Sequence, residues 1–317
     1  MVMRILCPEP TSFSSAGLDF ARRHATVTAG EMGQAEFECE APGYDAVLVR
    51  FNTRVGEQLM RGGHLKAVLS PTTGLDHIDL EAALRHKVRV YHLRGQKSFL
   101  KQVSATAELT VTLMLAVLRN LPQAFEAVKQ GQWEPGPFRG REVAGKTLGI
   151  VGCGRLGSKV ARVGRALGMR VVTFDPYVQR LPAGVERTLS LQSLLERSDV
   201  VSLHVPLMPE TRYMIGGREF DQFKVGAVLI NTSRGTIVDG DALLDALRTK
   251  KLSAAAVDVL EDEGQIVHHR RHSFIDYARE NANLLITPHI GGATVESVEK
   301  TDLFILSRYF KDQGIKT

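Results

Sequence analysis

A glycine-rich run near the middle of the 317-residue chain constrains its fold more than any other feature. The run has the spacing Gly-x-Gly-x-x-Gly and consists of Gly152, Gly154 and Gly157. It follows the apolar run 148–151 and opens the helix-like stretch 156–167, and a second apolar run, 171–174, ends at the acidic Asp175. A strand, a glycine turn, a helix and a second strand ending in a carboxylate are typical of a dinucleotide-binding βαβ unit.

Each glycine has a separate role in such a unit. Gly152 is expected to make the tight turn, Gly154 to let the backbone approach the pyrophosphate, and Gly157 to allow close packing of helix on strand. Asp175 would accept hydrogen bonds from the adenine ribose and repel a 2′-phosphate, and no arginine stands directly after it. The sequence therefore predicts NAD rather than NADP.

Strand-like and helix-like segments alternate from one end of the chain to the other. The expected strands are continuous apolar runs, which are typical of parallel strands covered by helices on both faces. These runs are 4–7, 46–49, 67–69, 89–91, 147–151, 170–174, 200–203, 227–230, 254–257 and 284–286. The amphipathic stretches between them include 55–61, 80–85, 191–197 and 239–248. The length suggests about two domains, so we expect two α/β domains.

One long helical pattern, 104–121, is apolar nearly all round and comes just before the nucleotide fingerprint. Such a helix is either buried between domains or covered by a second subunit. We expect it to form a homodimer interface, with the first domain boundary just before it, near residue 100. The last helical pattern, 294–310, is expected to return to the first domain.

Composition and charge argue against several classes of protein. The apolar share of 44% and charged share of 24% are ordinary for a globular protein, and the longest apolar stretch, around 113–118, is too short for a membrane span. The net charge of +5 is dispersed, with no basic helix that would indicate nucleic-acid binding. The N-terminus shows no secretion signal, and Cys7, Cys39 and Cys153 fit no disulfide framework, so we expect a cytoplasmic protein.

The one dense basic cluster is the run His-His-Arg-Arg-His at 268–272. It is either a solvated loop or a cationic rim that attracts an anionic substrate. Adjacent histidines in a charged run, with no matching set of carboxylates, lack the spacing of metal ligands. We therefore expect no metal site.

Three polar side chains, Arg234, Glu263 and His289, each stand a few residues beyond the end of an apolar run. The ligand crevice of an open α/β sheet lies at the carboxyl ends of its strands, so the three should converge beside the nicotinamide end of the cofactor. Taken singly, they also fit a surface arginine, an acidic loop residue and a turn histidine.

Hydride transfer to a 2-oxo acid requires these residue types together. It needs a fixed cation for the carboxylate and carbonyl, a proton donor, and a group that keeps the donor charged. His289 is the natural acid–base, because imidazole titrates near neutrality. A carboxylate such as Glu263 beside it would favour the imidazolium form.

On these motifs the chain resembles the D-isomer-specific 2-hydroxyacid dehydrogenases over nearly its whole length. The matching motifs are Gly152-x-Gly154-x-x-Gly157 with Asp175, Asn231-Thr232-Ser233-Arg234-Gly235, Asp258-Val259-Leu260-x-x-Glu263, and Thr287-Pro288-His289-Ile290-Gly291-Gly292. The resemblance implies two Rossmann-like or flavodoxin-like α/β domains with parallel sheets. A cofactor domain at 99–289 would be inserted into a substrate domain at 1–98 and 290–317.

The resemblance also implies the activity and its residues. The expected enzyme is an NAD-dependent oxidoreductase that interconverts a small 2-oxo acid and its D-2-hydroxy acid, such as a D-3-phosphoglycerate dehydrogenase or a glyoxylate/hydroxypyruvate reductase. Arg234, Glu263 and His289 would be catalytic. Besides the three glycines, the implied NAD contacts are Arg155, Leu156, Asp175, His204, Val205, Pro206, Thr211, Thr232, Ser233, Asp258 and Gly291. Among these, Asp258 would contact the nicotinamide carboxamide, and 204–206 would line the adenine pocket.

The N-terminal part carries the resemblance as well. The segment 70–79 is similar to the family's substrate loop, whose backbone N–H groups hold the substrate carboxylate; here those groups belong to Thr73 and Gly74. The family often has glycine where Thr72 stands, which suggests a narrower or differently shaped loop.

Two further features leave the substrate open. The segment 49–55 is similar to one in phosphoglycerate dehydrogenases whose arginine reaches the far end of the substrate, so Arg50 is either that contact or a salt-bridged structural arginine. Gly264 stands where the family usually has proline, before the stretch 265–280 that contains the basic cluster.

Two other functions remain as alternatives. Formate and phosphite dehydrogenases resemble this family, but a formate enzyme has glutamine in place of Glu263. A regulatory NAD sensor like the C-terminal-binding-protein corepressors keeps all three catalytic residue types. We expect no appended regulatory domain or nuclear tail, because the sequence stops soon after the last helix.

Overall fold

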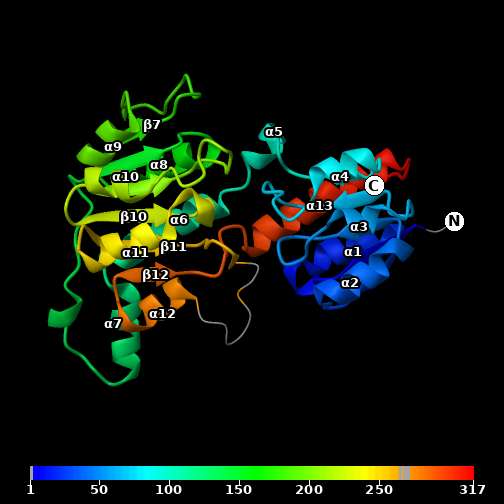
Figure 1. The fold of residues 1–317 in the computed structure, drawn as a ribbon, viewed down its shortest axis with the longest axis horizontal. Helices are drawn as coiled ribbons and strands as arrows, with labels where there is room; N and C mark the ends of the chain where they lie inside the picture. Colours follow the sequence, from blue (N-terminus) through cyan, green and yellow to red (C-terminus); the bar gives the residue numbers. More distant parts are fainter. Residues whose placement is uncertain (1–2, 264–265, 267–271) are drawn as a thin grey trace. The chain divides into compact units, whose positions relative to one another are not determined.

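The computed structural model describes residues 3–263, 266 and 272–317 (Figure 1). The chain divides into two compact units. The first unit consists of Met1–Val103 and Ala293–Thr317, and the second consists of Ser104–Gly292. The second unit is thus an insertion within the first. The expected division of labour, with substrate binding in one domain and cofactor binding in the other, stays a prediction.

The first unit is built on a five-stranded parallel sheet in the order β2-β1-β3-β4-β5, which is the flavodoxin-like order. Its strands are β1 (Arg4–Cys7), β2 (Thr26–Ala29), β3 (Ala46–Leu48), β4 (Ala67–Leu69) and β5 (Arg89–Tyr91). Both faces are covered by helices, as the buried strands require.

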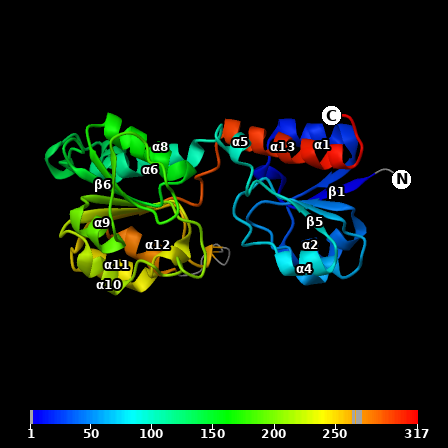
Figure 2. The same cartoon turned by 90° about the horizontal axis from the view of Figure 1, so that it is seen from above.

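Figure 2 shows α1 (Ser15–His24) and α13 (Val295–Asp312) on one face of this sheet. The other face carries α2 (Gln34–Glu40), α3 (Glu57–Met60) and α4 (Leu80–Arg85). The short α5 (Lys97–Leu100) completes the unit. Ile305, Leu306 and Phe310 of α13 are buried in the same cluster as Leu18 of α1, so the expected return of the last helix to the first part of the chain is confirmed.

The second unit contains a seven-stranded parallel sheet in the order β12-β11-β10-β9-β6-β7-β8. Its strands are β6 (Thr147–Val151), β7 (Arg170–Phe174), β8 (Val185–Arg187), β9 (Val200–Leu203), β10 (Ala227–Asn231), β11 (Leu252–Val257) and β12 (Leu284–Ile286). The strand order reverses beside β6, as in a Rossmann sheet with one further strand.

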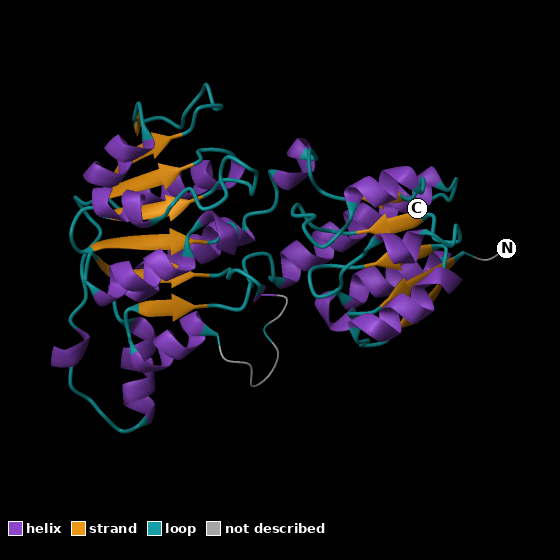
Figure 3. Ribbon diagram, viewed as in Figure 1, coloured by secondary structure: helices purple, strands orange, loops and turns teal. Residues whose placement is uncertain are grey.

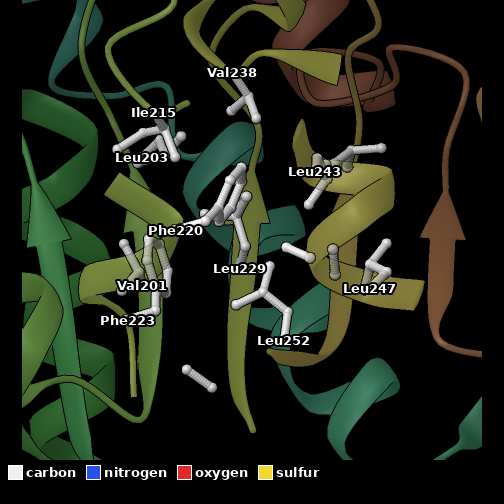
Figure 4. Close-up of a cluster of buried hydrophobic side chains, with 14 of the residues drawn as sticks. Val201, Leu203, Ile215, Phe220, Phe223, Leu229, Val238, Leu243, Leu247 and Leu252 are labelled. Atoms are coloured by element: carbon white, nitrogen blue, oxygen red, sulfur yellow. The ribbon is translucent and has the colours of Figure 1, made fainter. Parts of the chain in front are cut away.

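Helices cover both faces of this sheet as well (Figures 2 and 3). One face carries α6 (Ala105–Leu118) and α8 (Arg155–Ala166), and the other carries α9 (Leu191–Arg197), α10 (Gly217–Gln222), α11 (Gly240–Arg248) and α12 (Ser273–Glu280). Figure 4 shows the apolar layer under the second set, in which Phe220 and Leu243 pack against Leu229 of β10. Every residue of β10 is buried, which explains its continuous apolar run.

The expected helix 104–121 is two helices. α6 ends at Leu118, because Asn120 adopts a left-handed backbone with φ 50°, and α7 (Leu121–Lys129) begins with a proline in its first turn. The apolar faces of α6 contact α8 and the strands β10, β11 and β12. Much of its apolar character is therefore explained by packing within its own unit. No helix in the described part of the chain has the length and apolar character needed to cross a membrane.

Candidate active site and cofactor site

The three candidate catalytic residues follow neighbouring strands. β10, β11 and β12 pair in parallel, so their carboxyl ends lie at one edge of the sheet (Figure 1). Arg234, Glu263 and His289 come from the loops that leave these ends. The topology therefore brings the three loops to a common edge, which is where ligands bind in open α/β sheets.

Glu263 and His289 form a direct pair. Nδ1 of His289 lies 2.6 Å from Oε1 of Glu263, and the two side chains are 22% and 37% exposed, respectively. The second oxygen of Glu263 accepts a hydrogen bond from the Leu260 backbone N–H at 3.3 Å. One oxygen of the carboxylate thus binds the backbone of its own loop, and the other orients the imidazole of His289.

The backbone of His289 is held in an unusual conformation. Its φ is 53°, in the left-handed region that few residues other than glycine adopt. Its N–H donates to the backbone oxygens of Asp258 (2.9 Å) and Thr287 (3.0 Å). A non-glycine residue in this region is a feature that often accompanies a functional site, and here it accompanies the contact with Glu263.

Asp258 holds the loop that carries His289. Its carboxylate is buried, and Oδ1 accepts from the Thr287 hydroxyl (2.6 Å) and the Ile290 N–H (2.9 Å), while Oδ2 accepts from the Gly291 N–H (2.7 Å). Burial raises the pKa of Asp258, and these hydrogen bonds act in the opposite direction. Two residues expected to contact the cofactor, Asp258 and Gly291, therefore bind each other here.

Arg234 lies in a turn packed against the Glu263 loop. The side-chain amide of Asn231 donates to the Arg234 carbonyl at 2.9 Å, and Nη1 of Arg234 donates to the Ser233 carbonyl at 2.7 Å. A Cβ on Gly235 would lie 2.1 Å from the backbone carbon of Leu260, so only glycine fits at this contact. This close approach holds the turn of Arg234 beside the loop that contains Glu263.

The two residues before Arg234 anchor the same turn to other elements. The hydroxyl of Thr232 lies 2.8 Å from the hydroxyl of Thr110 on α6. The hydroxyl of Ser233 donates to the Leu203 carbonyl at the end of β9, at 2.6 Å. Thr232 and Ser233 thus tie the turn to a helix and a neighbouring strand.

The glycine-rich run forms a tight turn between β6 and α8. Gly152 has φ 88°, and a Cβ there would lie 2.8 Å from the His204 carbonyl oxygen. A Cβ on Gly157 would lie 2.1 Å from the Gly152 carbonyl oxygen, so helix and strand meet at backbone distance. At Gly154, the residue that caps α8, a Cβ would meet nothing within 4 Å. This open space at a helix N-terminus fits the approach of a diphosphate.

Arg155 and Leu156 begin α8 directly after this open position. Both are partly exposed, and burial lowers the pKa of the Arg155 guanidinium. Their backbone groups lie in the first turn of the helix, the end of a helix that favours anions.

Asp175 follows β7 and faces the glycine turn. Its Oδ2 accepts from the Cys153 N–H at 2.8 Å, and its Oδ1 accepts from the N–H groups of Tyr177 and Val178 at 2.9 Å. Asp175 as a whole is 8% exposed. Its position next to the glycine run is the one that recognition of an adenine ribose requires.

Arg187 is a neighbour of Asp175 that the sequence did not reveal. It lies on β8, which pairs with β7, and its Nη1 donates to the Asp175 backbone carbonyl at 2.6 Å. Its other terminal nitrogen donates to the Val178 carbonyl. Arg187 stands 12 positions after Asp175, on the edge strand β8, so the residues directly after Asp175 give no sign of it; the position of β8 is the signal that points to it. Its hydrogen bonds hold the loop 175–178.

The expected adenine wall is a compact loop after β9. Nε2 of His204 lies 2.9 Å from the Ser202 hydroxyl, and burial lowers the pKa of His204 to about 4. The Thr211 hydroxyl donates to the Pro206 carbonyl at 2.7 Å and accepts from the Met208 N–H at 2.8 Å. The segment 204–211 is thus closed on itself, with His204 and Val205 beside Gly152.

The remaining candidates lie in the first unit. Thr73 is exposed and Gly74 is buried, in a loop that leaves β4. Nη2 of Arg50 lies 2.6 Å from Oδ1 of Asp302 on α13, and the two side chains are 11% and 0% exposed. The salt-bridged alternative for Arg50 is therefore the arrangement observed, and its contact with a substrate stays a prediction.

The basic cluster lies mostly outside the described residues. Of 268–272, only His272 is described; it caps α12, and its Nδ1 accepts from the Phe274 N–H at 3.3 Å. Gly264 is also outside the described residues. Within the described ranges, no group of three His, Cys, Asp or Glu side chains is arranged to hold a metal ion.

Comparison with known proteins gives consistent matches. Residues 111–291 match the model of the D-isomer specific 2-hydroxyacid dehydrogenase NAD-binding domain. The chain is 35% identical over 301 residues to D-3-phosphoglycerate dehydrogenase of Archaeoglobus fulgidus, covering 93% of the chain and 54% of that protein. It is 32% identical over 314 residues to hydroxypyruvate reductase of Thermotoga maritima, covering 98% and 99%, respectively.

Solved structures agree with this pattern. The TT0316 protein from Thermus thermophilus superposes with a TM-score of 0.84 at 34% identity, covering 99% of this chain and 98% of that one. The chain spans about half the length of the phosphoglycerate dehydrogenases that it matches, and nearly the whole length of the hydroxypyruvate reductase.

Proposed function

Because the chain belongs to the D-isomer-specific 2-hydroxyacid dehydrogenase family, we propose that it uses NAD to interconvert a small anionic 2-oxo acid and its D-2-hydroxy acid. The observation that carries the proposal is the 2.6 Å contact between Glu263 and His289, at the sheet edge where the loop of Arg234 also lies. A carboxylate–imidazole pair beside a fixed guanidinium is the set of groups that reduction of a keto acid requires.

His289 is the proposed proton donor. When bound, NADH supplies the hydride that reduces the keto carbon of the substrate. Because Nδ1 of His289 faces Glu263, the proton that reaches the carbonyl oxygen comes from Nε2. Glu263 stabilises the imidazolium before transfer and keeps the ring in one orientation. In the oxidative direction the same Nε2 accepts the hydroxyl proton.

Arg234 is proposed to bind the substrate carboxylate and to polarise the carbonyl, because a guanidinium can donate two parallel hydrogen bonds to a carboxylate. The N–H groups of Thr73 and Gly74 are proposed as a further set of donors to the carboxylate.

The residues around the glycine turn fit a bound dinucleotide. The open position at Gly154 and the first turn of α8 at Arg155 and Leu156 would receive the diphosphate. Asp175 would accept the ribose hydroxyls, and 204–206 with Thr211 would form the adenine wall. Asp258, Gly291, Thr232 and Ser233 would border the nicotinamide end.

We also propose a homodimer and a cytoplasmic location. Support for the dimer comes from apolar side chains on α7 and just after it, where Phe125 is 66% exposed and Trp133 is 85% exposed. Support for the location comes from three free cysteines, two of them buried. Light scattering of the purified protein tests the homodimer, and a monomer would contradict it. Cell fractionation tests the cytoplasmic location, and enrichment in a secreted fraction would contradict it.

A screen of NADH consumption tests the activity. The acids to compare are glyoxylate, hydroxypyruvate, 3-phosphohydroxypyruvate, pyruvate and branched 2-oxo acids. We expect turnover with at least one, and in the reverse direction NAD reduction with the D-enantiomer of the product but not the L-enantiomer. Preference for the phosphorylated acid would favour a phosphoglycerate dehydrogenase activity. No NADH consumption with any of them, from a folded protein that binds NADH, would contradict the proposal.

A further inference from the structure

In the loop 72–75 of the first unit, the backbone carbonyl groups and the backbone N–H groups differ in their hydrogen bonding. All four of its carbonyl groups have donors within the chain. The pairs are Leu93 N to Thr72 O (2.9 Å), Arg94 Nε to Thr73 O (3.5 Å), Thr72 Oγ1 to Gly74 O (2.7 Å) and Ile78 N to Leu75 O (3.0 Å). The N–H groups of the same four residues donate to no acceptor in the described part of the chain.

Such a loop is prepared to bind an anion. Thr72, Gly74 and Leu75 are buried residues and Thr73 is exposed. Buried backbone N–H groups are nearly always paired, so unpaired ones at buried positions indicate a ligand. For these N–H groups to hold an anion, the carbonyl oxygens of the loop must be paired with other donors. The shortest of their hydrogen bonds is made by a side chain of the loop itself, Thr72.

Thr72 is the last hydroxyl of a buried chain of hydrogen bonds. Nε2 of His77 lies 3.2 Å from the Ser70 hydroxyl, and the Ser70 hydroxyl lies 2.8 Å from the Thr72 hydroxyl. Thr72 then donates to the Gly74 carbonyl at 2.7 Å. Ser70, Thr72 and His77 are 0%, 3% and 9% exposed, so water has little access to this chain.

The Gly74 carbonyl, at one end of this hydrogen-bond chain, determines which atom donates in each of its hydrogen bonds. A carbonyl oxygen cannot donate, so the single hydroxyl proton of Thr72 points at Gly74. The 2.8 Å contact between Thr72 and Ser70 then needs the Ser70 proton, because two oxygens without a proton between them repel at that distance. Ser70 must in turn accept from His77, so Nε2 of His77 carries a proton.

We propose that the hydrogen-bond chain His77–Ser70–Thr72 is a positioning device that fixes the Gly74 carbonyl, so that the N–H groups of loop 72–75 hold the carboxylate of the 2-oxo acid. This inference rests on the proposed function for the identity of the anion. Ser70, Thr72 and His77 are positioning residues, since they act through the backbone of the loop and not on the substrate. The threonine at a position where the family often has glycine thereby gains a role, because its hydroxyl fixes the peptide between Gly74 and Leu75, which carries the Leu75 N–H.

The proton on Nε2 of His77 can be tested without any turnover. Nitrogen-15 spectra of histidine-labelled protein, with the His77 signal assigned by its loss in His77→Gln, report which ring nitrogen is protonated. At about pH 8, where an imidazole of ordinary pKa is neutral, we expect a protonated Nε2. In Thr72→Val the Ser70 proton is released to turn toward His77, so protonation of Nε2 should decrease. An unprotonated Nε2 in the unmodified protein would overturn the proposal.

Kinetic comparison tests the positioning role. Thr72→Val keeps the shape of the side chain and removes its hydroxyl, whereas Thr72→Ser keeps the hydroxyl. We expect KM for the 2-oxo acid to rise about tenfold in Thr72→Val, with KM for NADH unchanged, and to stay within about twofold in Thr72→Ser, because one buried hydrogen bond is lost only in the first. Thr188→Val removes another buried hydroxyl that donates to a carbonyl, and serves as the matched control.

A double-mutant cycle separates a chain from independent contacts. Ser70→Ala should raise KM less than Thr72→Val does, and should add nothing further once Thr72 is valine, because the route to Gly74 is then already broken. Additive effects, or equal KM values for Thr72→Val and Thr72→Ser, would overturn the inference. Absence of turnover in the unmodified protein would refute the proposed function instead. Protonation of Nε2 of His77 would still show whether the hydrogen-bond chain exists.

Discussion

Two pairs of side chains in this molecule have the same distance between their polar atoms but differ in how far they are buried. In the first unit, Arg50 and Asp302 lie 2.6 Å apart with exposures of 11% and 0%. In the second, His289 and Glu263 also lie 2.6 Å apart, with exposures of 22% and 37%. The first pair joins the loop after β3 to α13, whereas the second lies in loops beyond the ends of β11 and β12.

The difference in burial separates a structural role from a chemical one. The remaining oxygen of Asp302 accepts from the N–H and the hydroxyl of Ser14, both at 2.8 Å. Both oxygens of this carboxylate therefore have hydrogen-bond partners within the protein. Burial raises the pKa of Asp302, while Arg50 and Ser14 act against that rise. The accessible pair can exchange protons with a ligand, whereas the buried pair joins two elements of the first unit. Distance alone does not distinguish the two roles.

Removal of the imidazole should give the largest effect of any single change. His289→Asn keeps a polar side chain but has no group that titrates near neutrality, so kcat should fall about a thousandfold. Affinity for NADH, measured by fluorescence titration, should stay unchanged. His64→Asn, at an exposed position, is the matched control. A kcat within about tenfold of the unmodified enzyme would remove His289 from the proton-transfer step.

Breaking the buried pair should act on stability. Arg50→Met leaves the Asp302 carboxylate buried without its cation, and the free energy of unfolding should fall by about 3 kcal/mol in urea titrations. Arg22→Met breaks an exposed pair with Asp19 and should change it by less than about 0.5 kcal/mol. A higher KM for a phosphorylated acid in Arg50→Met, with unfolding unchanged, would instead support the substrate contact for Arg50.

Asp175 tests whether a mostly buried carboxylate can still select a ligand. Asp175→Asn removes the charge that repels a 2′-phosphate, so the ratio of kcat/KM with NADPH to kcat/KM with NADH should rise about tenfold. Asp241→Asn, on the exposed side of α11, should leave the ratio unchanged. If Asp175→Asn also leaves it unchanged, the preference for NAD arises elsewhere.

The smallest effect is expected at Glu9, which accepts from the Arg50 backbone N–H at 2.7 Å. Burial raises the pKa of Glu9 above its ordinary value of 4.5, against opposing backbone hydrogen bonds. A carboxyl group with a raised folded-state pKa stabilises the fold at low pH and loses that contribution as pH rises through the folded value. The free energy of unfolding relative to Glu9→Gln should therefore fall as pH is raised from about 4.5. A difference that grows with pH would reverse this assignment.

The sequence revealed the second unit better than the first because its chemistry is local. The glycine run and the residues beyond β10, β11 and β12 each stand next to a continuous apolar strand, so strand ends could be located and their polar residues placed at one edge. The partner of Arg50 is Asp302, which is 252 positions away, and no short motif links them. The hydroxyl chain behind Thr72 was equally invisible, because it depends on side-chain geometry.

The strands that the sequence did not reveal share a physical cause. β2 and β8 are the edge strands of their sheets, and both are only partly buried. A search for continuous apolar runs finds strands covered on both faces and passes over these. The break between α6 and α7 was missed for a different reason: the apolar pattern continues through it, and only the left-handed Asn120 and the proline after it end the first helix.

Matched carboxylate-to-amide changes in the two pairs test the central claim most directly. Glu263→Gln and Asp302→Asn each remove one negative charge from a 2.6 Å contact, and kcat and the free energy of unfolding are measured for both. We predict that Glu263→Gln lowers kcat at least about tenfold with unfolding unchanged, and that Asp302→Asn lowers the unfolding free energy by about 3 kcal/mol with kcat per folded molecule unchanged. A loss of turnover in Asp302→Asn without a loss of stability, or the reverse in Glu263→Gln, would contradict the account.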